Sequence, residues 1–312
     1  MLDRTTNTIL TQWEPHYEDV FGCHPLLLRH RLHQSPLFDE MALAKLLETV
    51  ERCDYHVNWM DEGVRREGEF GDLSGGEILE AVKRGNIWIN LRAPHKANPA
   101  YGDLLEDIYS ELETHNPQLA TYKRSLTILI SSPKVQVKYH CDVPGQTLWQ
   151  VNGRKRVYVY PNNAPFLMQP DLERLVLGET HETDLGYRPW FDEFAKVYNL
   201  QPGEMLHWPH NGPHRVDNED CLNVSVTTEH WTTSLRNAYA VNYANGLLRK
   251  CGFDPSSRPE SGPGLYSRLA LAGVVKLSGL QRKAAKPYRV DFTVDPASSQ
   301  GVRYIKPYTF QH

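Results

Sequence analysis

The chain has 312 residues, a formal net charge of −4, 40% hydrophobic residues and 23% charged residues. This length allows one large domain or two ordinary ones, and the composition is that of a globular protein with a substantial core. The small negative charge and the lack of a long basic run argue against a nucleic-acid partner.

The five cysteines are scattered along the chain, and no two of them are spaced as Cys-x-x-Cys. This pattern indicates neither a disulfide framework nor a zinc knuckle, and it fits a reducing compartment. Residues 1–5 lack the apolar core of a signal peptide. The longest apolar stretch, residues 265–280, contains Arg268 and Lys276 and is too short to span a bilayer. We therefore predict a cytoplasmic protein without a membrane partner.

Residues 1–120 alternate between expected strands and helices. A β-rich composition predicts short strands at residues 26–28, 55–60 and 87–91. The spacing of apolar residues predicts helices at residues 41–47, 75–83 and 99–113. Two of these helices have start signals, because Asp39 precedes the first and Ser74 forms a capping box with Glu77 at the second. We expect residues 1–120 to form an α/β flank that packs on the following unit.

From about residue 125 the pattern changes to short, regularly spaced β-rich runs. The expected strands are residues 126–130, 134–140, 147–151, 155–160, 204–208 and 222–228. Turn residues separate the first four runs, and Asn152-Gly153 between two of them is a strong hairpin signal. Regular short strands of this kind predict a barrel or a sandwich of two sheets.

The other segments differ in composition from these strands. The acidic and aromatic insert at residues 171–199 is expected to contain a helix over residues 190–198. Helices are also expected over residues 234–251 and 265–280, with a linker rich in proline and serine at residues 254–264. The last 30 residues hold several aromatic side chains and are expected to be extended.

His140 and Asp142 end one of the β-rich runs. Side chains two apart on a strand point to the same face, so this pair can bind one ion while Cys141 points to the other face. A hydrogen-bonded pair on the surface is the alternative, and an isolated His-x-Asp would favour it. The strands that follow, together with a histidine downstream, favour a metal site. Two imidazoles and one carboxylate are the ligands of non-haem Fe(II) oxygenases.

The third ligand must come from elsewhere in the fold, and three histidines compete for this role. His207 lies within an expected strand, and His210 lies in the turn after it. His214 follows Gly212-Pro213 and begins the next strand, where a ligand at the mouth of a barrel is expected. We therefore prefer His214, although any one of the three alone would more often be structural.

Lys155 is the candidate for binding an organic anion. A 2-oxo acid that chelates the metal needs a cation at its distal carboxylate, and a lysine on a neighbouring strand supplies it. Arg154, Lys155 and Arg156 could instead be one solvated face of a strand. Alternation argues against this for Lys155, because its side chain points opposite to both arginines.

Two stretches in this order resemble a known family. The first comprises residues 128–133, 140–142 and 150–161, and the second comprises residues 202–216 and 223–226. Together they resemble the jumonji-C and cupin-like Fe(II)/2-oxoglutarate oxygenases. The resemblance is closest to the branch that contains the asparaginyl hydroxylase of hypoxia-inducible factor, and it covers about a third of the chain.

The resemblance implies roles for individual residues. His140, Asp142 and His214 match the iron ligands, and Lys155 matches the lysine that pairs with 2-oxoglutarate. Gln146 and Thr147 fall near a position where a polar side chain contacts this cosubstrate. Two further positions stay outside the predicted site: Glu229, because an acid would repel a carboxylate unless it turned away, and Tyr122, which cannot be aligned with the family's tyrosine.

The resemblance also implies a fold and a reaction. The expected fold is mainly β with α: a double-stranded β-helix (jelly-roll, cupin-like) at residues 121–232, flanked by residues 1–120 and by C-terminal helices and an extended tail at 233–312. The implied activity is hydroxylation of an unactivated C–H bond with Fe(II), 2-oxoglutarate and O2.

The substrate and partners are less defined by this resemblance. A peptide or protein side chain is the first expectation, a small metabolite the second, and a non-catalytic metal- or ligand-binding protein a further alternative. Aromatic residues of the insert would cover the mouth of the site or simply pack as core. The C-terminal helices would form a homodimer contact or an intrachain helix pair.

Overall fold

The computed structural model describes residues 8–61, 64–279 and 288–310, and two facing β-sheets form its centre. The larger sheet has ten strands in the order β1-β10-β7-β12-β5-β4-β2-β3-β13-β14, and the smaller has four in the order β6-β11-β8-β9. From β5 onward the chain moves back and forth between the two sheets. The eight strands β5 to β12 therefore form the double-stranded β-helix expected from the sequence.

The elements have the following bounds. The strands of the larger sheet are β1 (Leu26–Arg29), β2 (Tyr55–Asp61), β3 (Val64–Glu69), β4 (Ile87–Arg92), β5 (Tyr122–Ser131), β7 (Gly145–Asn152), β10 (Glu204–His207), β12 (Asn223–Trp231), β13 (Tyr288–Val294) and β14 (Val302–Phe310). The strands of the smaller sheet are β6 (Gln136–His140), β8 (Lys155–Val159), β9 (Lys196–Leu200) and β11 (His214–Asn218). The α-helices are α1 (Tyr17–Val20), α2 (Glu40–Thr49), α3 (Gly75–Arg84), α4 (Ala100–His115), α5 (Gln169–Val176), α6 (Thr233–Lys250) and α7 (Gly262–Ser278).

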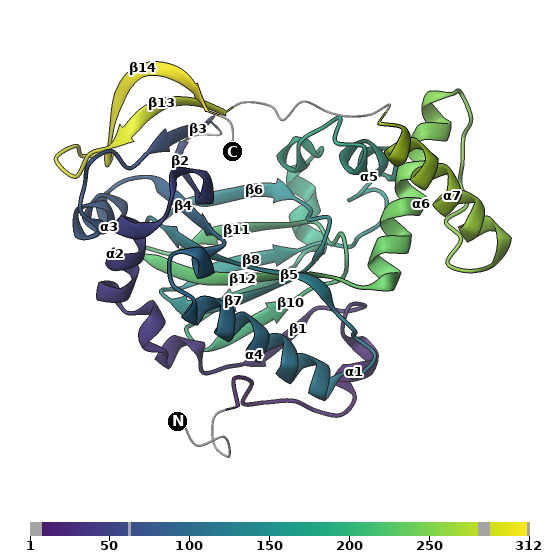
Figure 1. The fold of residues 1–312 in the computed structure, drawn as a ribbon, viewed down its shortest axis with the longest axis horizontal. Helices are drawn as coiled ribbons and strands as arrows, with labels where there is room; N and C mark the ends of the chain where they lie inside the picture. Colours follow the sequence, from purple (N-terminus) through teal and green to yellow (C-terminus); the bar gives the residue numbers. More distant parts are fainter. Residues whose placement is uncertain (1–7, 62–63, 280–287, 311–312) are drawn as a thin grey trace.

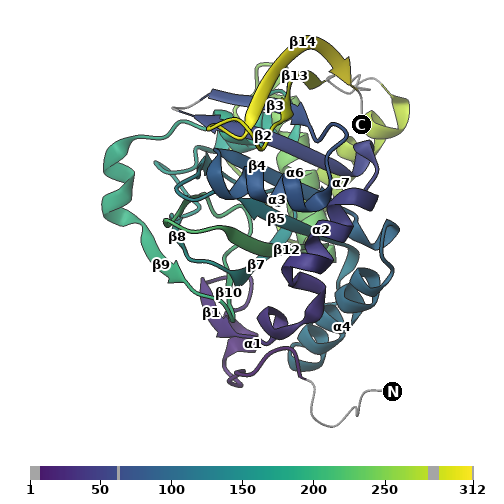
Figure 2. The ribbon, with the colours of Figure 1, turned by 90° about the vertical axis from the view of Figure 1, so that its left-hand side faces the viewer.

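Helices α2, α3 and α4 cover one face of the larger sheet, and the smaller sheet covers the other (Figures 1 and 2). The start of α3 follows from its sequence, because Ser74 and Glu77 form the predicted capping box. Such a cap stabilises a helix by about 1 kcal/mol. On the inner side of α4, Leu105, Ile108 and Leu112 are buried against the sheet.

The larger sheet continues beyond the β-helix on the side of β5. Strands β4, β2 and β3 from the N-terminal part extend it, and the hairpin β13–β14 from the C-terminal part follows (Figure 1). The predicted boundaries at residues 120 and 232 thus lie at the two ends of the β5–β12 unit, while one sheet runs across both. Helices α5, α6 and α7 pack together at the other end of the molecule around a second apolar cluster.

Two local expectations were wrong. Strands β7 and β8 flank Asn152-Gly153 but do not pair, because they belong to different sheets; the turn carries the chain from one sheet to the other. The helix expected at residues 190–198 is a 3-10 helix at Pro189–Phe194, followed by β9. Tyr198 and Leu200 are buried in the β-helix, so tertiary packing decides the extended conformation.

Other expectations agree with the described residues. The C-terminal tail forms the hairpin β13–β14, and residues 254–261 lie between α6 and α7 without regular structure. The helix expected to end at residue 280 ends at Ser278, and residue 280 itself lies outside the described residues. Within the described part of the chain, none of the helices combines the length and hydrophobicity needed to cross a membrane.

Candidate metal and 2-oxo acid site

His140, Asp142 and His214 come together where β6 ends and β11 begins. The two strands are antiparallel, and His214 is the direct register partner of His140. Asp142 follows β6 by two residues, and one ligand atom from each of the three side chains lies within 4.8 Å of the others. The two imidazole rings have centroids 4.1 Å apart. The three residues selected from the sequence therefore form one cluster.

Hydrogen bonds orient both imidazoles in the same way. Nδ1 of His140 lies 2.7 Å from the carbonyl oxygen of Lys138, and Nδ1 of His214 lies 3.0 Å from that of Gly212. A carbonyl can only accept, so each Nδ1 carries the proton and each Nε2 keeps a lone pair. Nε2 of His214 lies 3.4 Å from Oδ2 of Asp142. Two nitrogen donors and one carboxylate on one side of an ion fit Fe(II) with open positions.

The surroundings keep His214 neutral. Its side chain is buried under Trp208, whose ring centroid is 4.4 Å from that of the imidazole. Burial is the main reason that the pKa of His214 is well below its usual range, and the nearby His140 lowers it further. A neutral imidazole is the form that binds metals.

The two rival histidines have other roles. Both nitrogens of His207 are engaged, because Nε2 accepts from the backbone N–H of Gly22 at 2.8 Å and Nδ1 lies 3.0 Å from the carbonyl oxygen of Gln146. Its ring stacks on Phe21. Nε2 of His210 lies 2.7 Å from the carbonyl oxygen of Val143. Neither histidine belongs to the cluster around Asp142.

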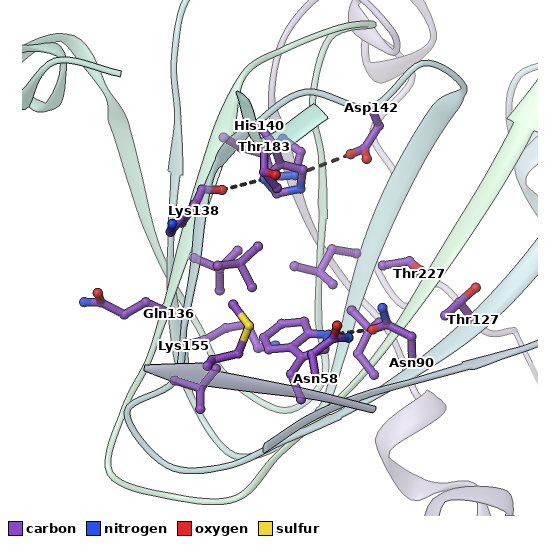
Figure 3. A pocket seen from close by; sticks show the side chains of 18 of the residues that line it. Asn58, Asn90, Thr127, Gln136, Lys138, His140, Asp142, Lys155, Thr183 and Thr227 are labelled. Carbon is purple, nitrogen blue, oxygen red and sulfur yellow. Dashed lines mark hydrogen bonds and ion pairs between the residues drawn. The ribbon is translucent and has the colours of Figure 1, made fainter. Parts of the chain in front are cut away.

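A cavity of about 730 Å³ extends from the triad into the space between the two sheets. His140 and Asp142 lie at one end of it, and Asn58, Asn90 and Lys155 lie toward the other (Figure 3). The volume is in the range of pockets that bind small molecules. The triad therefore opens into a space that can hold an organic ligand.

Lys155 lines this cavity and is 1% exposed, whereas Arg154 and Arg156 are exposed as alternation predicted. Its Nζ lies 5.4 Å from the ring centroid of Trp88. Within the described residues, no carboxylate pairs with this amine. Burial lowers the pKa of Lys155 to about 7, partly offset by Cys221. A buried ammonium without a counterion is costly, so an anionic ligand would stabilise it.

The other predicted contact residues divide between two faces of β7. Gln146 lines the cavity. Thr147 does not, because alternation along the strand turns it to the opposite face, where its hydroxyl bonds Thr228 at 2.5 Å and Trp149 at 2.9 Å. Its placement in the site was wrong.

Glu229 and Tyr122, the two residues left outside the predicted site, have different places in the structure. Glu229, which was left out of the site, lines the cavity opposite Gln146 and accepts a hydrogen bond from Ser125 at 3.3 Å. Tyr122 lies outside the cavity and donates to the carbonyl oxygen of Thr232 at 3.4 Å.

Three polar or aromatic lining residues were missed because no local motif marks them. Asn58 on β2, Trp88 on β4 and Asn90 on β4 face the cavity from strands outside the β-helix. Alternation along residues 87–91 places Trp88 and Asn90 on one face, which is the only sequence signal for them. Knowing which face borders the cavity required the tertiary structure.

The insert contributes less to the cavity than expected. Of residues 171–199, only Thr183 lines it among the described residues. Phe191 is buried in the apolar cluster with Tyr139 and Phe166, and the Tyr187 and Trp190 rings contact Phe191. Phe191 therefore packs in the core, while Tyr187 and Trp190 cover it from the surface, and none of the three lines the cavity.

The sequence profile of the cupin-like domain family matches residues 65–234, which is more than half of the chain. The chain belongs to this family, and the cupin-like part of the resemblance seen in the sequence is confirmed. Among curated proteins, no sequence matches the chain.

Several solved structures are similar to the chain at low sequence identity, and one of them has a TM-score above 0.5. A crystal structure of YcfD from Escherichia coli matches with a TM-score of 0.51 and 16% identity, covering 86% of this chain and 68% of that one. A second structure, described as the ribosomal oxygenase YcfD, matches with a TM-score of 0.48, 17% identity and coverages of 86% and 68%. A third, of YcfD with cobalt and 2-oxoglutarate, matches with a TM-score of 0.47, 18% identity and coverages of 86% and 67%.

Three buried histidines outside the metal cluster, His30, His207 and His230, predict acid sensitivity. Burial lowers the pKa of His207 to about 3, and it lowers those of His30 and His230 to about 4. An unfolded histidine has a pKa near 6.5, whereas these histidines stay neutral in the folded protein at lower pH. The free energy of unfolding is therefore highest above pH 6.5 and decreases as the pH falls below this value. Each histidine contributes about 1.4 kcal/mol per pH unit. We expect His207→Phe to take up one proton fewer on unfolding than the wild type. Its free energy of unfolding, measured with urea between pH 7 and pH 5, should therefore depend less steeply on pH.

The buried neighbour Leu206 supplies the control, and Leu206→Ala should keep the pH dependence of the wild type because it removes packing but no titratable group. An unchanged slope in His207→Phe would show that His207 does not stay neutral in the folded protein.

Proposed function

We propose that this protein is an Fe(II)- and 2-oxoglutarate-dependent oxygenase that hydroxylates an unactivated C–H bond, in a peptide or protein side chain. One observation carries the proposal. The triad of His140, Asp142 and His214 opens into the same cavity as Lys155, a buried amine with no carboxylate partner in the described structure. Membership of the cupin-like family supports the same reading.

Different residues would bind the metal and the cosubstrate. His140, Asp142 and His214 would hold Fe(II) through two Nε2 atoms and a carboxylate, and the remaining positions would face the cavity. Bound iron would supply the activation of O2 coupled to oxidation of 2-oxoglutarate to succinate and carbon dioxide. Lys155 would neutralise the distal carboxylate of 2-oxoglutarate, and Gln146 lies in reach of the ligand space near the triad.

The lining of the cavity bears on the substrate. Asparagine, glutamine, threonine, lysine and arginine side chains line much of it, so it is not the closed apolar pocket expected for an apolar metabolite. This supports a polar substrate such as a peptide segment. A cytoplasmic location is part of the proposal and is supported by the five cysteines, which are not joined in disulfides.

Replacement of one ligand tests the metal site. We expect His140→Ala to lose stoichiometric binding of Co²⁺ in equilibrium dialysis, because two ligands hold a divalent ion much less tightly than three. Iron-dependent succinate formation, measured above a chelator control, should disappear with it. His210→Gln is the matched control, since its side chain faces the carbonyl of Val143 and should keep both properties. Unchanged succinate formation in His140→Ala would refute the assignment, and metal binding without any turnover would indicate a non-catalytic binder.

Lys155 predicts how 2-oxoglutarate binding depends on charge and pH. We expect Lys155→Met to weaken the binding of 2-oxoglutarate about a hundredfold, near 3 kcal/mol, because a buried charge-assisted pair is lost. The wild-type affinity should fall by up to about tenfold per pH unit above pH 7, where the free amine loses its proton. Isothermal titration with Zn²⁺ in place of iron measures both effects. Arg156→Met, on the outer face of the same strand, should change neither; a pH profile shared by Lys155→Met would contradict the assignment.

We also propose that α7 forms a homodimer contact. Leu265 and Ala272 are buried within the chain, whereas Tyr266, Val274 and Leu277 are 68%, 66% and 91% exposed on the same helix. Exposed apolar side chains of this kind favour association. Sedimentation velocity should show a dimer that Leu277→Glu converts to a monomer, and a monomeric wild type would contradict the contact.

A further inference from the structure

The cavity reaches beyond the β-helix, onto strands that the N-terminal part adds to the larger sheet. Asn58 and Met60 on β2 and Arg65 on β3 line it there. In Figure 3, Asn58 and Asn90 lie at the end of the cavity away from His140 and Asp142. We call this region, defined by Asn58, Arg65 and Asn90, the outer subsite. Lys155 lies toward the same end, and Arg65 on β3 is two strands beyond β4 in the order of the larger sheet, on the side away from the β-helix.

Arg65 is held in place without being neutralised. Its Nε donates to Oδ1 of Asn58 at 2.7 Å, which fixes the plane of the guanidinium group. Among the described residues, no carboxylate or carbonyl accepts from its two terminal nitrogens. The side chain is exposed at the rim, while Asn58 is only 2% exposed. An anchored guanidinium with a free pair of N–H donors is the arrangement that binds a carboxylate through two parallel hydrogen bonds.

The two asparagines present donors to the same space. Oδ1 of Asn58 is occupied by Arg65, and Oδ1 of Asn90 accepts from Nε1 of Trp88 at 2.5 Å. With both oxygens engaged, the amide nitrogens remain, and neither has an acceptor among the described residues. Trp88 lies beside both asparagines, because it is the register partner of Asn58 on the neighbouring strand and is two residues from Asn90 on its own strand. Asn58 is buried and Asn90 is half-buried, so both amide nitrogens can donate to a ligand in the cavity.

The charges of the cavity point to the sign of that ligand. Five cationic side chains line it: Arg65, Arg92, Lys134, Lys138 and Lys155. Two carboxylates line it, and they lie elsewhere: Asp142 is in the triad and Glu229 faces Gln146 at the start of β7. Among the described residues that line it, the outer subsite thus combines a cation and amide donors. Glu67, the register partner of Asn58, does not line the cavity, and its carboxylate lies 2.7 Å from Nδ1 of His56.

We propose that the outer subsite binds a carboxylate of the substrate, remote from the carbon that is oxidised. The inference rests on the proposed function, since it assigns Lys155 to the cosubstrate and the triad to the metal. The carboxylate belongs either to a small organic acid or to an aspartate or glutamate side chain of a polypeptide. Arg65 provides the charge, and Asn58 has two roles: its Oδ1 holds Arg65, and its amide nitrogen faces the ligand space.

The test measures binding without turnover. The full chain is loaded with Zn²⁺ and saturating 2-oxoglutarate, and ligand binding is followed by saturation-transfer NMR and competition titration. One arm uses butyrate, malate, citrate and benzoate. The other uses randomised nonapeptides with a central glutamate and the same pool with a central glutamine. We expect one arm to bind, with the glutamate pool preferred over the glutamine pool if the ligand is a polypeptide.

Substitutions locate the binding in the outer subsite. Arg65→Met should weaken the carboxylate ligand at least tenfold. Arg65→Gln should do the same while keeping an N–H that can reach Asn58, and Asn58→Leu should weaken binding because the guanidinium is released. Arg66→Met is the matched control: Arg66 is the next residue of β3, but it pairs with Asp291 and Tyr304 on the other side. Its affinity should equal that of the wild type.

Three outcomes would overturn the proposal: no carboxylate ligand binds the wild type, Arg65→Met and Arg65→Gln bind as well as the wild type, or the ligand competes with 2-oxoglutarate and so shares the site of Lys155. Failure of the proposed function gives a different result. In that case the wild type does not bind 2-oxoglutarate in the isothermal titration with Zn²⁺. Binding of the organic acids and of the peptides is then measured without 2-oxoglutarate.

Discussion

The antiparallel pairing of β6 with β11 places His214 directly opposite His140, and the rest of the site depends on this register. A shift by one residue would turn one imidazole to the other face of the sheet and separate the ligands. The turn after β6 then brings Asp142 to the same place. Asn211 fixes this turn, because its side-chain amide donates to the carbonyl of Asp142 at 2.8 Å. The strand pairing and the hydrogen bond of Asn211 thus set the geometry of the three side chains, which would lower the cost of assembling them around one ion.

The cavity between the sheets is lined by polar side chains, and this has a cost that a ligand would offset. Lys155 is buried beside Trp88, and Asn58 and Asn90 keep amide nitrogens without acceptors in the described structure. Water or a ligand must satisfy such groups, since unpaired buried donors and charges are destabilising. The same groups that destabilise the empty fold would therefore favour an anionic ligand in the cavity.

Because the larger sheet extends past the β-helix, strands of the N-terminal part border the cavity. Strands β4 and β2 continue the sheet past β5, and the face they turn to the smaller sheet carries Trp88, Asn90 and Asn58. Helices α2, α3 and α4 cover the opposite face and hold these strands in place. The part of the chain that resembles a supporting flank in the sequence thus supplies one wall of the cavity.

The sequence by itself determined the parts that depend on local chemistry. Alternation separated Lys155 from its two arginine neighbours, capping residues located α2 and α3, and the His-x-Asp pair with a later histidine defined the triad. Tertiary structure decided the rest, for physical reasons that lie outside any local window. Whether Asn152-Gly153 closes a hairpin or joins two sheets depends on which strands pair. Residues 196–200 are extended because Tyr198 and Leu200 fill the β-helix, and Thr147 leaves the site because only one face of β7 borders the cavity. One wall of the cavity consists of Asn58, Trp88 and Asn90. It forms only when β2 and β4 pair beside β5, a strand that lies far from β2 in the sequence.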